Sequence, residues 1–162
     1  MLPLQPKLMR KSDHNYRTPG YYFITLKTAG SRNLFGRYES GNDVILSRFG
    51  RIALECWHRN DEVYQTVSND LYRFMPNHMH ALLMLEFGES TRDAGVHLSK
   101  VVTSYKGVVT KEIRRLTGNA DMQVWQRNYY ERIVTSERAL QNIRSYILYN
   151  PLMIELEGKG LR

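Results

Sequence analysis

Two histidines, His78 and His80, are the residues of this chain whose type and spacing point most directly to chemistry. Successive side chains of a β-strand leave opposite faces, so residues two positions apart leave the same face. Both imidazoles would then lie together on one side of a sheet, while Met79 enters the core on the other side. Neighbouring imidazoles are ligands for a divalent metal ion. The spacing therefore predicts a metal site, provided that this segment is a strand.

Tyr146 and Asn150 form a second pair that could do chemistry, near the C-terminal end of the sequence. Positions four apart share a face of an α-helix, so a phenol and an amide oxygen would project together. Tyr38 and Asn42 have the same spacing, but they lie in a turn-rich segment where such positions share no face. Spacing alone leaves two interpretations of Tyr146 open, a nucleophile or a half-buried helix tyrosine that packs beside Ile143.

Much of the positive charge of the chain, whose formal net charge is +7, lies on a predicted helix over residues 98–116. A basic chain suits a polyanionic partner, most often nucleic acid, but lysines on a solvated helix face give the same composition. The candidate DNA contacts on this helix are Lys100, Lys106, Lys111, Arg114 and Arg115.

The elements that must position these residues alternate between strand and helix patterns. Strands are predicted over 21–27, 34–38, 70–74, 79–87 and 123–134 from β-branched, aromatic and alternating apolar residues. Helices are predicted over 45–59, over 98–116 with Gly118 closing the end, and from the capping residue Ser136 to Pro151. This order predicts an α+β fold, a ferredoxin-like (RRM-like) antiparallel sheet with helices on one face.

The length of 162 residues predicts one domain over 19–151, with an N-terminal arm over 1–18 and a C-terminal tail over 152–162. No apolar run approaches the roughly 20 residues that a membrane span needs, and no signal peptide is apparent. The single cysteine, Cys56, excludes an internal disulfide and fits a reducing compartment. We therefore expect a cytoplasmic protein with no membrane partner.

Four sequence blocks together resemble the single-tyrosine HUH transposases, which include insertion-sequence enzymes and REP-associated tyrosine transposases. Residues 75–80, Met-Pro-Asn-His-Met-His, are similar to the metal motif of that family. Residues 104–106, 124–133 and 144–151 are similar to its later blocks, in the same order. The resemblance covers residues 19–151, and it implies the ferredoxin-like fold for this catalytic domain.

The resemblance also implies roles for individual residues. It selects Tyr146 as the catalytic nucleophile, and Asn150 as a third metal ligand beside His78 and His80. Many members have glutamine at the position of Asn150. Lys106 falls in the family-like Ser-Tyr-Lys block and is the best candidate for a phosphate contact. The implied activity is nicking and rejoining of single-stranded DNA at hairpin-marked ends, through a 5′-phosphotyrosine, supported by Mg²⁺ or Mn²⁺.

Other functions remain open from the sequence. A domesticated REP-associated enzyme would process palindromic repeats without moving an element. A non-catalytic nucleic-acid-binding module on the same fold has no need of His78, His80 and Tyr146 together. A two-histidine metal oxygenase lacks an obvious carboxylate ligand and leaves the basic charge unexplained. The oligomeric state is open too. A resemblance to the insertion-sequence members implies a homodimer in which a helix of one chain serves the partner's active site, whereas REP-associated members can act alone.

Overall fold

A computed structural model describes residues 19–40, 43–86 and 96–158, with side chains described as far as Tyr149. The predicted N-terminal arm, residues 1–18, lies outside the described residues, as does the last predicted residue of the 79–87 strand. No helix in the described part of the chain is long and apolar enough to span a membrane.

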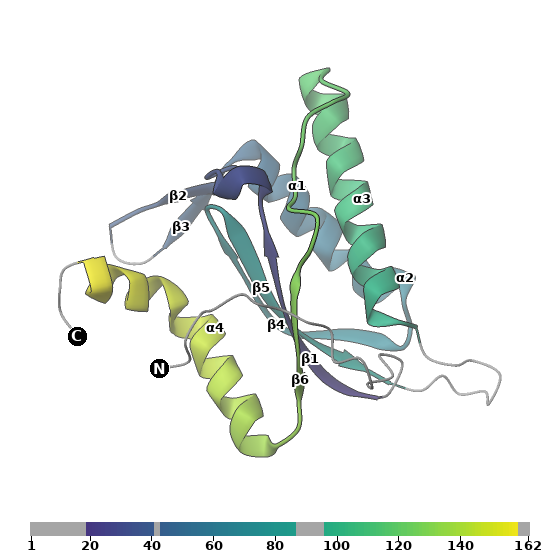
Figure 1. The fold of residues 1–162 in the computed structure, drawn as a ribbon, viewed down its shortest axis with the longest axis vertical. Coiled ribbons are helices and arrows are strands. Elements are labelled where there is room, and N and C mark those ends of the chain that lie inside the picture. Colours follow the sequence, from purple (N-terminus) through teal and green to yellow (C-terminus); the bar gives the residue numbers. More distant parts are fainter. Residues whose placement is uncertain (1–18, 41–42, 87–95, 159–162) are drawn as a thin grey trace.

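The centre of the fold is a four-stranded antiparallel sheet in the order β4-β5-β1-β6. Its strands are β1 (Gly20–Lys27), β4 (Val67–Met75), β5 (His78–Leu85) and β6 (Tyr130–Val134). β5 and β6 pair with the two edges of β1, so the first strand lies inside the sheet although it begins the domain. Figure 1 shows this sheet between helices on its two sides. The order is that of a ferredoxin-like fold, which confirms the predicted class.

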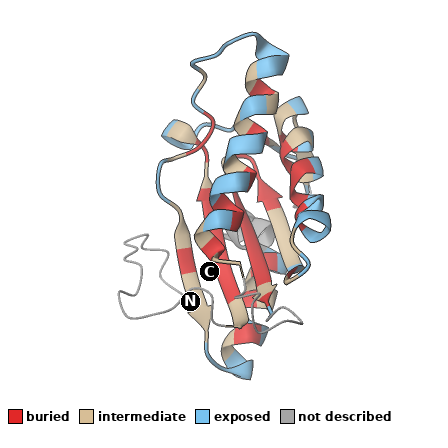
Figure 2. Cartoon of the chain, turned by 90° about the vertical axis from the view of Figure 1, so that its right-hand side faces the viewer, coloured by how far each residue is buried: buried red, intermediate tan, exposed pale blue. Residues whose placement is uncertain are grey.

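Two helices, α1 (Arg48–His58) and α3 (Leu98–Thr117), cover one face of the sheet. Alternate residues of β1, namely Tyr22, Ile24 and Leu26, turn into the core beneath them and are at most 1% exposed. The two helices contact each other through the rings of Trp57 and Tyr105, whose centroids are 4.9 Å apart. Figure 2 shows the central strands buried and the outward side of α3 exposed. Period-two burial in the strands and helical periodicity in α3 therefore build one core, as predicted.

A fourth helix, α4 (Glu137–Gly158), packs on the opposite face of the sheet. The side chain of Ser136 accepts a hydrogen bond from the amide of Ala139 at 3.1 Å, so the predicted cap is present. The second, smaller core lies between this helix and the sheet; its buried members are Phe23, Leu82, Leu140, Ile143 and Ile147. The same strands thus carry a large core on one face and a helix with the candidate nucleophile on the other.

The first helix, predicted over residues 45–59, begins three residues later than predicted, at Arg48. Residues Val44–Leu46 form a short strand, β3, which pairs with β2 (Gly36–Tyr38). Ser47 is the N-cap of α1 and its side chain accepts a hydrogen bond from the amide of Gly50. A Cβ on Gly50 would lie 2.1 Å from the carbonyl oxygen of Phe35, so only glycine permits this approach. The helical spacing of Ile45 was coincidental.

Two short helical segments, η1 (Ala29–Ser31) and α2 (Asn60–Val63), were not predicted. The strand predicted over 123–134 is real only at Tyr130–Val134. Before it, the chain follows the end of β1 without forming a regular strand, through an isolated bridge between Thr28 and Trp125. The amide of Gln126 donates to the carbonyl of Lys27 at 2.9 Å. These residues meet the turn after β1, which cannot continue the ladder of a strand.

The prediction that Pro151 ends the last helix was wrong, because α4 continues to Gly158. A proline removes its own amide from the helical hydrogen bonds, but it leaves those of the following residues intact. The predicted limit between domain and tail, after residue 151, therefore falls inside a helix.

Candidate active site

His78 and His80 lie on β5 and face α4, on the side of the sheet away from α1 and α3. In the sheet register, His80 is opposite Thr25 of β1 and Arg73 of β4, and His78 is opposite Lys27. Met79 between them is fully buried in the larger core. The strand alternation predicted for this motif is therefore confirmed.

Each imidazole is held through its Nδ1 atom. His78 Nδ1 donates to the side-chain oxygen of Asn77 at 2.7 Å. His80 Nδ1 makes a buried hydrogen bond of 2.8 Å with the hydroxyl of Thr25. These contacts fix both rings and direct the two Nε2 atoms toward one point, where they are 3.2 Å apart. A hydrogen bond at the far nitrogen is the usual way in which proteins orient a metal-binding histidine.

The distance between the two Nε2 atoms suits two ligands of one ion. Ligand nitrogens about 2.1 Å from a metal, at an angle of about 100°, are about 3.2 Å apart. The donor types also fit, since imidazole binds divalent transition metals well. In the described part of the chain no three His, Cys, Asp or Glu side chains form a metal-binding group, so a third ligand from those residues would be of another type.

Burial keeps both imidazoles neutral. It lowers the pKa of His78 to about 4, with a further contribution from the charge of Lys27. Burial lowers the pKa of His80 well below the usual 6.5, and the nearby His78 and Lys27 act in the same direction. Only a neutral imidazole can bind a metal, so the two histidines are in the competent form at neutral pH without losing a proton.

Tyr146 of α4 lies against His80. Its ring is 5.1 Å from that of His80, centroid to centroid, at an angle of 62°. Phe23 of β1 contacts both groups, edge-on to Tyr146 at 6.1 Å and stacked on His80 at 5.5 Å. By contrast, Tyr149 is 57% exposed and belongs to neither core. The structure therefore brings the predicted nucleophile into contact with His80, one of the predicted metal ligands, within one chain.

Asn150 follows Tyr146 by four residues on α4, as the sequence requires. Its side chain lies outside the described residues. Its role as a ligand stays a prediction.

Two polar contacts fasten α4 to the edge strand β4. Arg144 forms a bidentate ion pair with Asp70, with nitrogen–oxygen distances of 2.8 and 3.0 Å. Asp70 is at a bulge between Asn69 and Leu71, where the ladder with β5 is interrupted. Arg73 donates to the carbonyl of Leu148 at 2.9 Å. The two contacts lie on either side of Tyr146 along the helix.

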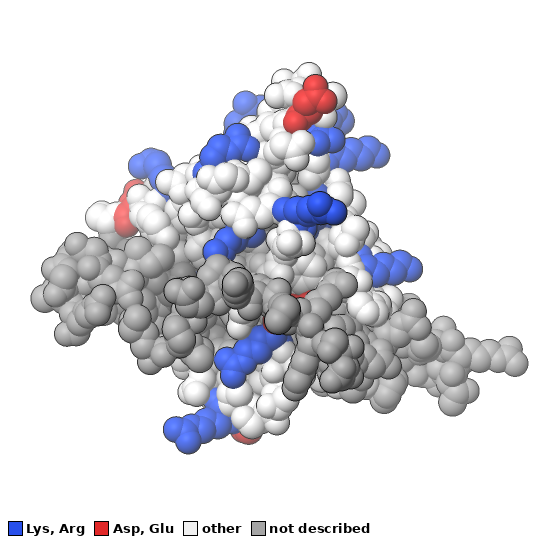
Figure 3. All heavy atoms as spheres, viewed as in Figure 1, with Lys and Arg blue, Asp and Glu red and all other residues white. Residues whose placement is uncertain are grey.

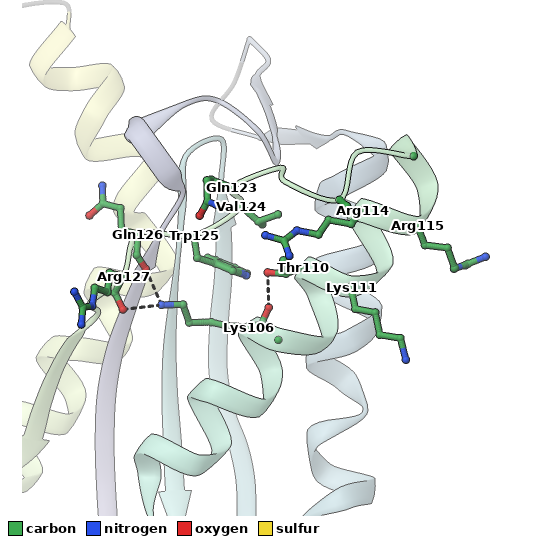
Figure 4. Close-up of a pocket in the computed structure, with 13 residues that line it drawn as sticks. Lys106, Thr110, Lys111, Arg114, Arg115, Gln123, Val124, Trp125, Gln126 and Arg127 are labelled. Carbon is green, nitrogen blue, oxygen red and sulfur yellow. Dashed lines mark hydrogen bonds between the residues drawn. The ribbon is translucent and has the colours of Figure 1, made fainter.

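The five cations predicted to contact DNA have different surroundings in α3. Lys106 is half-buried and donates to the carbonyl oxygens of Gln126 and Arg127 at 2.7 and 3.3 Å, and burial lowers its pKa. Arg114 donates through Nε to the carbonyl of Met122 at 3.0 Å. The other three, Lys100, Lys111 and Arg115, are exposed. Lys106 and Arg114 thus connect α3 to the segment that precedes β6 (Figure 4).

Sequence reasoning missed several residues that shape these sites. Thr25 is 55 positions from its partner His80, so no local pattern could reveal the contact. Asn77 is adjacent to His78, and an amide directly before the motif was the available signal. Asp70 and Arg127 also gave no signal. Asp70 pairs with Arg144, and the carbonyl of Arg127 accepts from Lys106, and both partners are distant in the sequence.

The sequence profile of a family described as IS200-like transposases matches residues 51–150, which include the histidine pair and Tyr146. The match covers more than half of the chain. The chain belongs to the IS200-like transposase family. This confirms the resemblance seen in the sequence blocks and places the protein among DNA transposases.

Comparison with individual proteins agrees with the family. An uncharacterised protein of Haemophilus influenzae is 29% identical over 162 aligned residues, 91% of this chain and 88% of that protein. A second Haemophilus influenzae protein is described as a candidate REP-associated tyrosine transposase. It is 27% identical to our chain over a segment that covers 48% of our chain and 46% of that protein. A solved REP-associated tyrosine transposase bound to a REP hairpin has the same fold, with a TM-score of 0.56 and 16% identity over 90% of this chain and 74% of that one.

Proposed function

We propose that this transposase nicks and rejoins single-stranded DNA at hairpin-marked ends through a 5′-phosphotyrosine intermediate, with a divalent metal ion. The observation that carries the proposal is the contact between Tyr146 and His80 within one chain, at a centroid distance of 5.1 Å. This contact places a phenol, a potential nucleophile, next to a pair of neutral imidazoles that can bind a metal ion.

The covalent step exchanges one phosphate ester for another. The Oη atom of Tyr146 forms a bond to the phosphorus and gives up its proton to solvent. The bond between phosphorus and the 3′ oxygen breaks, and that oxygen takes up a proton and leaves as a hydroxyl. The part of the strand downstream of the break remains on the tyrosine through its 5′ phosphate, as a phosphate ester. Attack by a 3′-hydroxyl reverses the step, so rejoining needs no external energy source.

His78 and His80, with Asn150, would hold Mg²⁺ or Mn²⁺, and the bound ion would polarise the scissile phosphate as a Lewis acid. Two imidazoles favour Mn²⁺ over the harder Mg²⁺. Lys27 is close enough to lower the pKa of both histidines, and the same charge would attract the phosphate. Phe23 covers one side of His80, on which its ring is stacked.

Hairpin specificity is supported by the solved relative of the same fold that is bound to a REP hairpin. It is also supported by the local similarity to a protein described as a REP-associated tyrosine transposase. The proposal for this chain is a single DNA strand next to a hairpin, with the strand at Tyr146 and the hairpin outside the catalytic cluster.

The decisive experiment is a search for the covalent adduct. Labelled hairpin DNA with a single-stranded extension, incubated with Mn²⁺, should give a denaturant-resistant complex in which the protein is joined to the 5′ phosphate at the nick. Tyr146→Phe removes only the hydroxyl and should abolish the complex while the fold and DNA affinity remain. Tyr149→Phe is the matched control, because this exposed tyrosine on the same helix should leave the adduct intact.

Each other outcome would overturn part of the proposal. An adduct that persists in Tyr146→Phe and disappears in Tyr149→Phe or Tyr130→Phe would identify a different nucleophile. Tight hairpin binding with no adduct under any metal would favour a non-catalytic nucleic-acid-binding module.

A further inference from the structure

Lys27 is the last residue of β1, and its side chain leaves the sheet on the face that carries the histidine pair. Ile24 and Leu26 turn into the larger core, so Thr25 and Lys27 turn to the opposite face. In the sheet register Lys27 is directly opposite His78. Residues directly opposite in antiparallel strands have Cβ atoms about 4.5–5.5 Å apart. The half-buried Lys27 therefore places an ammonium group beside the histidine pair.

Tyr146 and Lys27 lie at opposite ends of the histidine pair. Tyr146 contacts His80 and, edge-on, Phe23. Phe23 precedes Lys27 by four positions on β1, so their Cα atoms are about 13 Å apart at the usual rise of a strand. Lys27 is opposite His78, the member of the pair farther along the sheet from Phe23. The order along the sheet is therefore Tyr146, His80, His78 and Lys27.

This order matches the geometry of an in-line displacement at phosphorus. In such a displacement the attacking oxygen and the leaving oxygen lie on opposite sides of the phosphorus atom. A scissile phosphate bound at the histidine pair would have Tyr146 on one side and Lys27 on the other. Negative charge develops on the leaving oxygen as its bond to phosphorus breaks, and a cation fixed beside it lowers the energy of the transition state.

The charge of Lys27 acts on the site rather than on a carboxylate partner. Burial is the main cause of the lowered pKa of His78 and of His80, and the charge of Lys27 lowers both values further. Within the part of the chain that the structure describes, no Asp or Glu forms an ion pair with Lys27. Its positive charge is therefore available to an anionic group that enters the site.

We propose that Lys27 is a further catalytic residue of this site, whose ammonium group stabilises the leaving 3′ oxygen during attack by Tyr146. The inference rests on the proposed function, because it assigns the second participant of the same displacement. The Oη atom of Tyr146 bonds to phosphorus and loses its proton to solvent. The electron pair of the breaking bond stays on the 3′ oxygen, which takes up a proton from solvent. In the rejoining step the same ammonium faces the attacking 3′-hydroxyl.

The test compares a normal strand with one in which sulfur replaces the 3′ oxygen at the scissile bond. The pKa of a thiol is about 8.5, far below that of an aliphatic hydroxyl, so sulfur leaves readily without a neighbouring cation. Lys27→Met removes the charge and keeps an unbranched side chain. With Mn²⁺, this variant should form adduct about 100- to 1000-fold more slowly than the unaltered protein on the oxygen substrate. On the sulfur substrate it should react at nearly the unaltered rate.

Two further measurements separate the charge of Lys27 from a structural role. Lys27→Arg keeps the charge and should recover much of the rate on the oxygen substrate. Mn²⁺ calorimetry without DNA should show that Lys27→Met binds the ion at least as tightly as the unaltered protein, because a neighbouring positive charge repels a cation. Weaker Mn²⁺ binding by Lys27→Met would overturn the inference, since it would show that Lys27 supports the histidine pair.

A control must account for the general attraction of DNA to a basic protein. Figure 3 shows Lys and Arg side chains at both the upper and the lower end of one face, so the loss of any cation could weaken DNA binding. Arg51→Ala is the charge-matched control, because Arg51 is exposed on α1, across the sheet from the histidine pair. It should form adduct at the unaltered rate on both substrates. A loss equal to that of Lys27→Met would overturn the inference.

The two substrates also distinguish failure of the inference from failure of the proposed function. Equal slowing of Lys27→Met on both substrates would overturn the inference, because it would indicate lost binding rather than a poorer leaving group. An unaltered rate on the oxygen substrate would overturn it as well and leave the proposed function intact. No adduct from the unaltered protein on either substrate would contradict the proposed function, and the role of Lys27 with it.

Discussion

At the scale of single residues, the candidate metal site includes Thr25 as the residue that supports His80. Its hydroxyl bonds to His80 Nδ1 at 2.8 Å in a buried environment. This contact fixes the ring and leaves Nε2 directed at His78 Nε2, 3.2 Å away. Thr25 is 6% exposed and comes from a neighbouring strand, so it serves the site without touching a substrate.

Thr25→Val should weaken Mn²⁺ binding about tenfold to a hundredfold, the usual effect of losing an outer partner of a ligating histidine. Calorimetry should give one site per chain in the unaltered protein, the weaker site in Thr25→Val, and none in His80→Ala. Thr25→Ser keeps the hydroxyl and should bind Mn²⁺ nearly as well as the unaltered protein. Equal binding by the unaltered protein and His80→Ala would remove the metal site altogether.

The lowered pKa of His78 predicts that acid destabilises the metal-free protein. The unfolded chain takes up a proton near pH 6.5, whereas folded His78 does so only near its pKa of about 4. The stabilisation is fully present above pH 6.5 and is lost as the pH falls toward 4, with a limit of about 3 kcal/mol.

Urea unfolding with a chelator, between pH 7 and 4, measures this effect as a free energy of unfolding. His78→Gln cannot titrate, so its stability should depend less steeply on pH over this range. His58→Gln is the comparison, because His58 is exposed. Equal pH dependence in His78→Gln and the unaltered protein would contradict the burial of a neutral imidazole.

At the scale of elements, α4 determines where the nucleophile lies. The helix packs on the sheet through Leu140, Ile143 and Ile147, and the Asp70–Arg144 pair sets its position along β4. The pair is partly exposed, so its value for stability is small. Its value for geometry is larger, because Tyr146 is two residues from Arg144.

Arg144→Ala should slow adduct formation about tenfold to a hundredfold, the cost of a nucleophile displaced by about 1 Å. Mn²⁺ affinity should remain, since neither histidine contacts the pair. Arg144→Lys keeps the charge and should recover part of the rate. Arg138 is an exposed cation about two helical turns before the nucleophile, so Arg138→Ala should form adduct at the unaltered rate. A loss of Mn²⁺ binding in Arg144→Ala would show that the pair supports the site as a whole.

At the scale of the whole molecule, the candidate catalytic cluster is assembled from three distant parts of one chain. β1 contributes Thr25 and Phe23, β5 contributes the histidine pair, and α4 contributes Tyr146. One chain therefore brings together the predicted nucleophile and the histidine pair.

A mixture of Tyr146→Phe and His80→Ala should form no adduct, because neither chain has a complete cluster. The measurement is the yield of covalent complex from the mixed proteins, compared with each alone and with the unaltered protein. Restored yield in the mixture would mean that α4 of one protomer completes the site of another, as in a dimer with exchanged helices.

The sequence predicted those features that depend on neighbours along the chain. The alternation around Met79 placed both histidines on one face, and the spacing of apolar residues with Gly118 defined α3 almost to its ends. Ser136 marked the start of α4 for the same reason, since a cap acts on amides three residues away. The sequence could not predict that residues 123–129 form no regular strand. Their backbone groups form hydrogen bonds with the turn after β1, which is distant in the sequence.

The site itself was partly a matter of sequence and partly of packing. His78, His80 and Tyr146 were found from spacing and from resemblance to a family. Their contact, the support from Thr25 and the Asp70–Arg144 pair arise only when the sheet order β4-β5-β1-β6 brings separate segments together. Packing also divided the cations of α3 into those that bond to backbone carbonyls and those that stay exposed. Which of the two a side chain does depends on the carbonyls that lie opposite it. Local periodicity encodes which face a side chain takes, and only the folded chain decides what it meets there.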